Sequence, residues 1–158
     1  MERGQNAELR DRLQSPQLRY VGLQSTASHL QSLAQIDAQV LGLSREKHHR
    51  FLINSNAMRG VALYAGDDCV GYVYVSSDGH VGPLAVTRRD LMSAAFRTAL
   101  NLAVESSSPQ VSGFLTGTSE APRIALEHGM RITIPMLLMS NCDFGNWSLY
   151  LPRNSGFM

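Results

Sequence analysis

Two arginines, Arg88 and Arg89, immediately precede the segment with the clearest helical pattern in the sequence. The N-terminus of a helix presents free backbone N–H groups and the positive end of the helix dipole, and both attract phosphate. The pair is therefore a candidate site for a phosphorylated ligand, although Asp90 places a negative charge beside it. The alternative is that Arg88 and Arg89 are solvated residues at an ordinary helix start, because charged runs are common on protein surfaces.

A second residue that could take part in catalysis is His80, which follows the turn at residues 77–79. An imidazole with a pKa of about 6.5 can accept a proton from an amine. A single histidine beside a turn is more often simply exposed. His48 and His49 are adjacent, so in a helix they point about 100° apart and do not form a metal-binding pair. We therefore expect no metal site.

The hydrophobic pattern predicts the elements that position these residues. Helices are expected at residues 27–41, 44–53, 90–105 and 118–128, and strands at 18–23, 60–65, 70–75, 80–86, 111–115, 132–139 and 147–151. Tight turns make the strands between residues 60 and 86 antiparallel, whereas the helix-length link from 80–86 to 111–115 requires a parallel crossover. The expected fold class is α/β (α+β), with a mixed, mostly antiparallel sheet and helices on both faces.

Length and charge limit the possible classes of protein. The chain has 158 residues, which is the size of one domain, here assigned to residues 18–158 behind a polar tail or short helix at 1–17. Lys and Arg number 14 against 13 Asp and Glu, and this balance argues against a nucleic-acid partner. The isolated cysteines Cys69 and Cys142 indicate a reducing, cytoplasmic setting. No apolar run is long enough to cross a membrane.

The element order over residues 18–151 resembles that of the GNAT N-acetyltransferase superfamily. The resemblance also rests on the segments VGYVYVSSDGHVGPLAV and ALEHGMRI, while IDAQVLGLSREKHH is similar to the C-terminal acetyltransferase-like domain of two-domain members. It implies a GNAT-type sheet of six to seven strands and an acyl-CoA co-substrate, such as acetyl-CoA. The implied reaction transfers the acyl group to a small-molecule or peptide amine.

The resemblance also assigns residues. Residues 89–94 are the best fit to the family's pyrophosphate loop, Arg/Gln-x-x-Gly-x-Gly/Ala: Arg89 and Ala94 match, and Met92 replaces the middle glycine and would crowd the phosphate. Arg88 would add charge. The backbone of Leu84, Ala85 and Val86 would pair with the pantetheine arm, in a slot opened between this strand and residues 111–115. An alternative is that Gly82-Pro83 is only a bulge in the strand.

The sequence departs from the family where catalysis is expected. Ala125 stands where many members have a tyrosine acid, and the strand at 80–86 has no glutamate, which leaves His80 as the candidate base. Asp37 interrupts the apolar face of the first helix and either lines the substrate cleft or caps a neighbouring loop. We interpret Tyr150 as a tyrosine that anchors the sheet. The departures favour a rival hypothesis, a non-catalytic GNAT-like domain that binds coenzyme A or mediates dimerisation. A homodimer contact is also possible through the aromatic residues near the C-terminus.

Overall fold

The computed structural model describes residues 18–155, and its centre is a six-stranded sheet with the order β1-β2-β3-β4-β5, in which β6 also pairs with β4. The strands are β1 (Arg19–Gly22), β2 (Met58–Ala65), β3 (Asp68–Ser76), β4 (His80–Val86), β5 (Ser112–Gly113) and β6 (Tyr150–Leu151). All neighbouring pairs are antiparallel except β4 and β5, which are parallel. The predicted mixed, mostly antiparallel sheet is confirmed. Residues 1–17, predicted to be a tail or short helix, lie outside the described residues.

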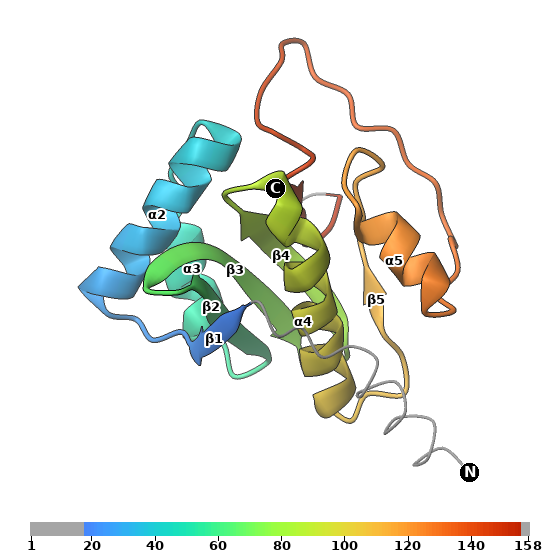
Figure 1. The fold of residues 1–158 in the computed structure, drawn as a ribbon, viewed down its shortest axis with the longest axis horizontal. Coiled ribbons are helices and arrows are strands. Elements are labelled where there is room, and N and C mark those ends of the chain that lie inside the picture. The colour runs from blue at the N-terminus through green and yellow to red at the C-terminus, as the bar shows by residue number, and fades with distance from the viewer. Residues whose placement is uncertain (1–17, 156–158) are drawn as a thin grey trace.

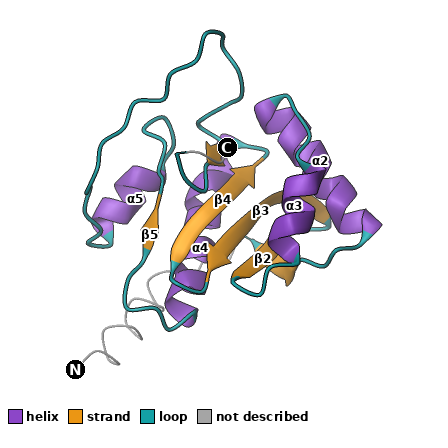
Figure 2. Ribbon diagram, turned by 180° about the vertical axis from the view of Figure 1, so that it is seen from behind, coloured by secondary structure: helices purple, strands orange, loops and turns teal. Residues whose placement is uncertain are grey.

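Helices cover both faces of this sheet, as Figures 1 and 2 show from opposite sides. The helices α2 (Ala27–Leu41) and α3 (Glu46–Ile53) lie on one face, and α4 (Met92–Glu105) lies on the other, with α5 (Ala121–Glu127) beside it. The side chain of Thr26 caps α2 by accepting from the N–H of His29, and Gly42 ends the helix at φ +75°.

The start of β4 contains a bulge. Val75 pairs with Val81 and Val73 with Leu84, so two residues, Gly82 and Pro83, lie opposite one residue of β3. Gly82 has φ +134°, and a Cβ there would lie 2.7 Å from the carbonyl oxygen of Pro152. The bulge brings the C-terminal segment close to β4, and only glycine fits this conformation and space.

The edge of the sheet beyond β4 differs most from the prediction. The strand expected at 111–115 is reduced to Ser112–Gly113, and the one expected at 147–151 to Tyr150–Leu151. The strand predicted at 132–139 is wrong, because these residues form an exposed loop without strand pairing to any described residue. Pro135 has no N–H to give to a sheet, and α5 leads the chain away from the edge of β5 (Figure 1).

Candidate functional site

Strands β4 and β5 separate shortly after they meet. His80 pairs with Ser112 and Val81 with Gly113, and no further pairing joins the two strands. Beyond Val81, the edge of β4 that would face β5 is therefore not paired with it. We call this divergence the fork. A slot between residues 84–86 and 111–115 was expected, and the two strands do separate there, although they part already after Val81 and Gly113.

The chain's own C-terminal segment occupies the edge of β4 inside the fork. Leu84 pairs with Leu151 and Ala85 with Tyr150, antiparallel, and the N–H of Val86 donates to the carbonyl oxygen of Leu149 at 3.0 Å. Residues 149–151, which we call the plug, therefore take the same backbone groups of Leu84, Ala85 and Val86 that the resemblance assigned to a pantetheine arm.

Contacts on several sides hold the plug. Thr116 Oγ1 donates to the carbonyl oxygens of Trp147 and Tyr150 at 2.7 and 3.2 Å. The ring of Tyr150 is fully buried and packs edge-on against Trp147. Arg45 Nη1 donates to the Tyr150 hydroxyl at 2.7 Å, and the guanidinium lies 4.9 Å from the ring centre. Tyr150 thus anchors the sheet, as we interpreted from the sequence.

The helix start beyond β4 presents charge of both signs. A short 3-10 turn, η1 (Arg89–Leu91), leads into α4. Arg88 donates to both carboxylate oxygens of Asp90, at 3.2 and 3.1 Å, whereas Arg89 is exposed and no described carboxylate pairs with it. Met92 is fully buried in the core, so its side chain does not stand over the helix start as we expected.

Ala94 is buried in the first turn of α4. It is packed in the hydrophobic core, and its side chain is unavailable to a ligand. Arg89 is therefore the residue of the predicted loop whose side chain is freest to meet a phosphate group.

His80 lies where β4 and β5 are still paired, at the opposite end of β4 from Arg89. Its Nδ1 is 2.9 Å from Ser112 Oγ, and its Nε2 is 2.5 Å from the carbonyl oxygen of Arg153. Both ring nitrogens are thus engaged in holding β5 and the C-terminal segment. Its assignment as a base stays a prediction.

A buried polar cluster fills the space between the sheet and the two helices α2 and α3. Its members are side chains from four elements and one helix cap: Asp37, Arg45, His49, Tyr72, Tyr74 and Tyr150. Asp37 is at the centre and is fully buried. Arg45 Nε and Nη2 donate to its two carboxylate oxygens at 3.0 and 3.1 Å, and the Tyr72 hydroxyl donates at 2.5 Å.

The cluster extends in two directions from Asp37. His49 Nε2 lies 2.8 Å from Asp37 Oδ2, and His49 Nδ1 lies 2.9 Å from the Tyr74 hydroxyl. On the other side Arg45 joins Asp37 to the plug through Tyr150. Because each of these groups has a hydrogen-bonding partner, burying them is tolerated.

The ionisation of the cluster follows from these contacts. Burial alone raises the pKa of Asp37, but hydrogen bonds from His49 and Arg45 more than offset it, so this pKa lies below its ordinary value. Burial raises the pKa of Tyr150 to about 12 against the lowering effect of Arg45. At neutral pH the centre is therefore a carboxylate–guanidinium pair with neutral tyrosines around it.

The sequence reading missed this cluster as a unit. From the sequence, Asp37 was singled out only as an interruption of an apolar helix face. Asp37 does fix the loop before α3, through Arg45 at the N-cap of that helix. Ala125 is buried in α5 and supplies no hydroxyl.

Comparison with solved structures establishes the fold. An aminoglycoside 6′-N-acetyltransferase of Acinetobacter baumannii is 11% identical, with a TM-score of 0.55, and the match covers 80% of this chain and 99% of that one. A second, AAC(6′)-Iy, solved with the bisubstrate analogue CoA-S-monomethyl-acetylneamine, is 8% identical with a TM-score of 0.56 over the same shares. A ribosomal-protein-alanine N-acetyltransferase of Brucella melitensis is 14% identical, with a TM-score of 0.54, again over 80% and 99%. The chain has the fold of these three acetyltransferases.

Sequence comparison adds no closer relative: no family model matches the chain, and no curated protein matches it. Within residues 18–155, no helix has the length and apolar character needed to cross a bilayer. The same residues hold no group of three or more His, Cys, Asp or Glu side chains arranged for a metal ion.

Proposed function

We propose that the chain is an acyl-CoA-dependent N-acyltransferase that transfers an acyl group, such as acetyl, to a small-molecule or peptide amine. The observation that carries the proposal is the fork, where β4 leaves β5 and pairs through Leu84, Ala85 and Val86 with a short extended segment. An extended pantetheine arm has amide groups that can replace those of the plug. The neutral amine attacks the thioester carbonyl, the C–S bond breaks, and the amine proton passes to the leaving thiolate.

In this proposal, binding requires the plug to leave the fork. The arm and residues 149–151 compete for one edge of β4, with the N–H of Val86 as the shared donor. Arg89 and the start of α4 would hold the pyrophosphate, with Arg88 available once it releases Asp90. His80 is the proposed base from the sequence, and reaching an amine would require it to give up one of its two present contacts.

Thermal unfolding with coenzyme A and acetyl-CoA tests the proposal. A ligand that binds the folded state at 100 times its dissociation constant adds about 2.7 kcal/mol to the free energy of unfolding. We expect both compounds to stabilise the chain and a panel of amines to release free thiol from acetyl-CoA. No stabilisation by either compound would contradict the proposal.

Replacing Arg89 with Ala is expected to weaken coenzyme A binding about 10- to 150-fold. The reason is the loss of a charge-assisted hydrogen bond to phosphate, worth about 1.5–3 kcal/mol. Isothermal titration with coenzyme A measures the change. Arg50→Ala is a matched control, since Arg50 is also an exposed arginine but lies on α3 and pairs with Glu46. Equal affinities in Arg89→Ala and the unaltered chain would show that the loop assignment is wrong.

A second candidate function is a GNAT-like domain without catalysis. The specific observation in its favour is the plug, because the chain already satisfies the edge that a coenzyme would use. Ala125 also favours this alternative, because its side chain has no hydroxyl that could protonate a thiolate. Stabilisation by coenzyme A with no thiol release across the amine panel would identify this alternative.

A further inference from the structure

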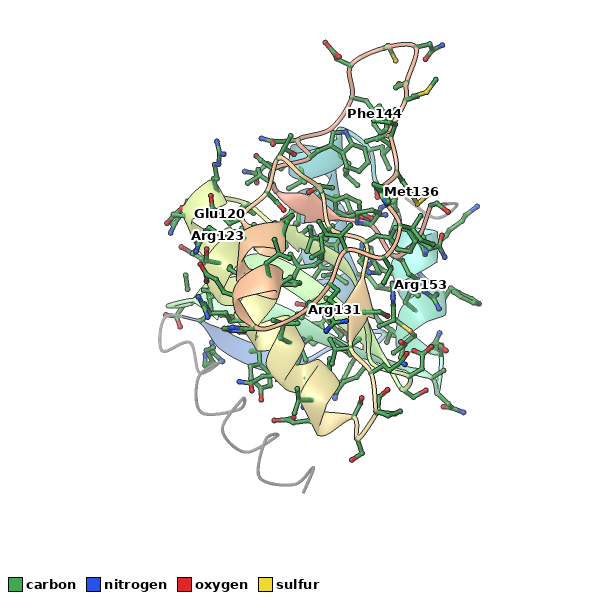
Figure 3. The ribbon with its side chains drawn as sticks, turned by 90° about the vertical axis from the view of Figure 1, so that its right-hand side faces the viewer. Glu120, Arg123, Arg131, Met136, Phe144 and Arg153 are labelled. Atoms are coloured by element: carbon green, nitrogen blue, oxygen red, sulfur yellow. The ribbon has the colours of Figure 1, made fainter. Side chains whose placement is uncertain are left out.

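The chain from residue 131 to residue 145, which we call the outer loop, runs outside the body of the domain. Figure 1 shows it leaving α5, passing along the outer side and over the top, and returning to β6. Figure 3 places Met136 and Phe144 along this path. Both ends are fixed, since the N–H of Met130 donates to Ala125 and that of Asn146 donates to Val40, at 2.9 and 2.7 Å.

The outer loop exposes large apolar side chains one after another. Six of the eight residues between 132 and 139 are such side chains, with exposed fractions from 55 to 90%: Ile132, Ile134, Met136, Leu137, Leu138 and Met139. Soluble monomers rarely expose an apolar run of this extent. The backbone groups of residues 132–139 also make no hydrogen bond to another described residue. The segment therefore offers both apolar surface and unpaired backbone.

We infer that this segment is a contact surface between two copies of the chain. Burying one such side chain removes on the order of 100 Å² of apolar surface from water. Six of them supply at most about 600 Å² per protomer and about 1,200 Å² for two, which reaches the lower limit of a specific interface. The segment alone is thus large enough to form a two-fold contact.

The charge pattern fits a copy of the same segment. No charged residue occurs from Ile132 to Cys142, with Arg131 and Asp143 on either side. Two such segments can lie antiparallel without placing like charges opposite each other, as a two-fold contact requires. A lipid surface is less suited, because interfacial segments carry aromatic residues and several Lys or Arg, which this stretch lacks.

Sedimentation velocity of the purified chain over a wide range of concentrations tests the inference. We expect a concentration-dependent dimer in the unaltered chain. Replacing the two most exposed members together, Leu137→Lys with Met139→Lys, should weaken the dimer by more than about tenfold, since both would place charge in the contact. Their exposed fractions of 90 and 84% mean that folding does not depend on them, and circular dichroism checks this.

Phe51→Lys is the matched control, because Phe51 is an exposed apolar residue on α3 with an exposed fraction of 64%. It should leave the dimer intact. A monomer at all concentrations, a dimer unaffected by the double substitution, or open-ended assembly would each overturn the inference. Co-flotation of the unaltered chain with phosphatidylcholine vesicles, abolished by the double substitution, would also overturn it in favour of a lipid surface. These experiments measure the mass of the assembly and its binding to vesicles. Their outcome therefore does not depend on whether the chain catalyses acyl transfer.

Discussion

Replacing Asp37 with Ala is expected to lower the free energy of unfolding at neutral pH by about 3–5 kcal/mol, which is the cost of removing one partner from a buried ion pair. The substitution leaves the Arg45 guanidinium buried without its carboxylate and removes a partner of His49 and Tyr72. Denaturant unfolding measures the change. Glu46→Ala serves as the control, because the pair Glu46–Arg50 is half exposed and its loss should change the free energy by less than about 1 kcal/mol.

The effect of Asp37→Ala should depend on pH in a defined direction. The pKa of Asp37 is lower in the folded chain than its ordinary value. The carboxylate therefore contributes its full stability above a pH of about 4, and that contribution disappears as the pH falls through the folded-state pKa. The two unfolding curves should approach each other in acid. A constant difference from neutral to strongly acidic pH would show that Asp37 acts through packing rather than charge.

Replacing Tyr150 with Phe is expected to lower thermal stability and yet to tighten coenzyme A binding, by about 5- to 150-fold. The substitution keeps the ring but removes the acceptor for Arg45 Nη1. Leaving that buried donor unpaired disfavours the plugged state by about 1–3 kcal/mol, whereas water can reach the donor once the plug has left. Because apparent affinity rises with the fraction of molecules able to bind, an easier departure of the plug strengthens binding.

Tyr74→Phe is the control for this result. It also removes a buried hydroxyl from the cluster, the one paired with His49 Nδ1, but Tyr74 is not in contact with the plug through that group. It should lower thermal stability and leave coenzyme A affinity unchanged. Titration calorimetry on both variants separates the cases. Equal or weaker coenzyme A binding in Tyr150→Phe would contradict the competition between plug and coenzyme.

The parts of the fold that depend on local patterns could be predicted from the sequence. Thr26 and Gly42 mark the ends of α2, and the Asp78-Gly79 turn joins the antiparallel strands β3 and β4. The long apolar face of residues 90–105 predicted the helix that the structure has as α4. These signals act over a few residues, so neighbouring side chains and turn chemistry suffice to determine them.

The C-terminal quarter could not be predicted in this way. An apolar segment at 132–139 has the composition of a strand, but a strand also needs a neighbour at its edge, and periodicity carries no information on which neighbour is available. The same limit applies to the plug. The sequence pattern predicts a strand at residues 149–151. It does not predict that this strand pairs with β4 rather than β5, because that pairing depends on the divergence of the two strands at the fork.

The candidate site was predicted in part. The backbone edge at Leu84–Val86 and the divergence of β4 from β5 came from the resemblance, and the structure has both, whereas the role of the edge remains a proposal. The cluster around Asp37 was missed because its members lie up to 113 positions apart, from Asp37 to Tyr150. The packing of α2 and α3 on the sheet, together with the pairing of β6 with β4, brings them together. The one sequence feature that could have indicated the cluster is the carboxylate of Asp37 on an apolar helix face. A carboxylate buried there needs a cation or hydrogen-bond donors nearby.

Amide hydrogen exchange of the full chain, with and without saturating coenzyme A, tests most directly whether the plug and the coenzyme share one edge. Adenosine 3′-phosphate 5′-diphosphate is the control ligand, since it has the phosphates but lacks the pantetheine arm. With coenzyme A, the amides of residues 149–151 should exchange faster while that of Val86 stays protected, and the control ligand should leave both unchanged. Coenzyme A bound at saturation with residues 149–151 as protected as before would contradict the account.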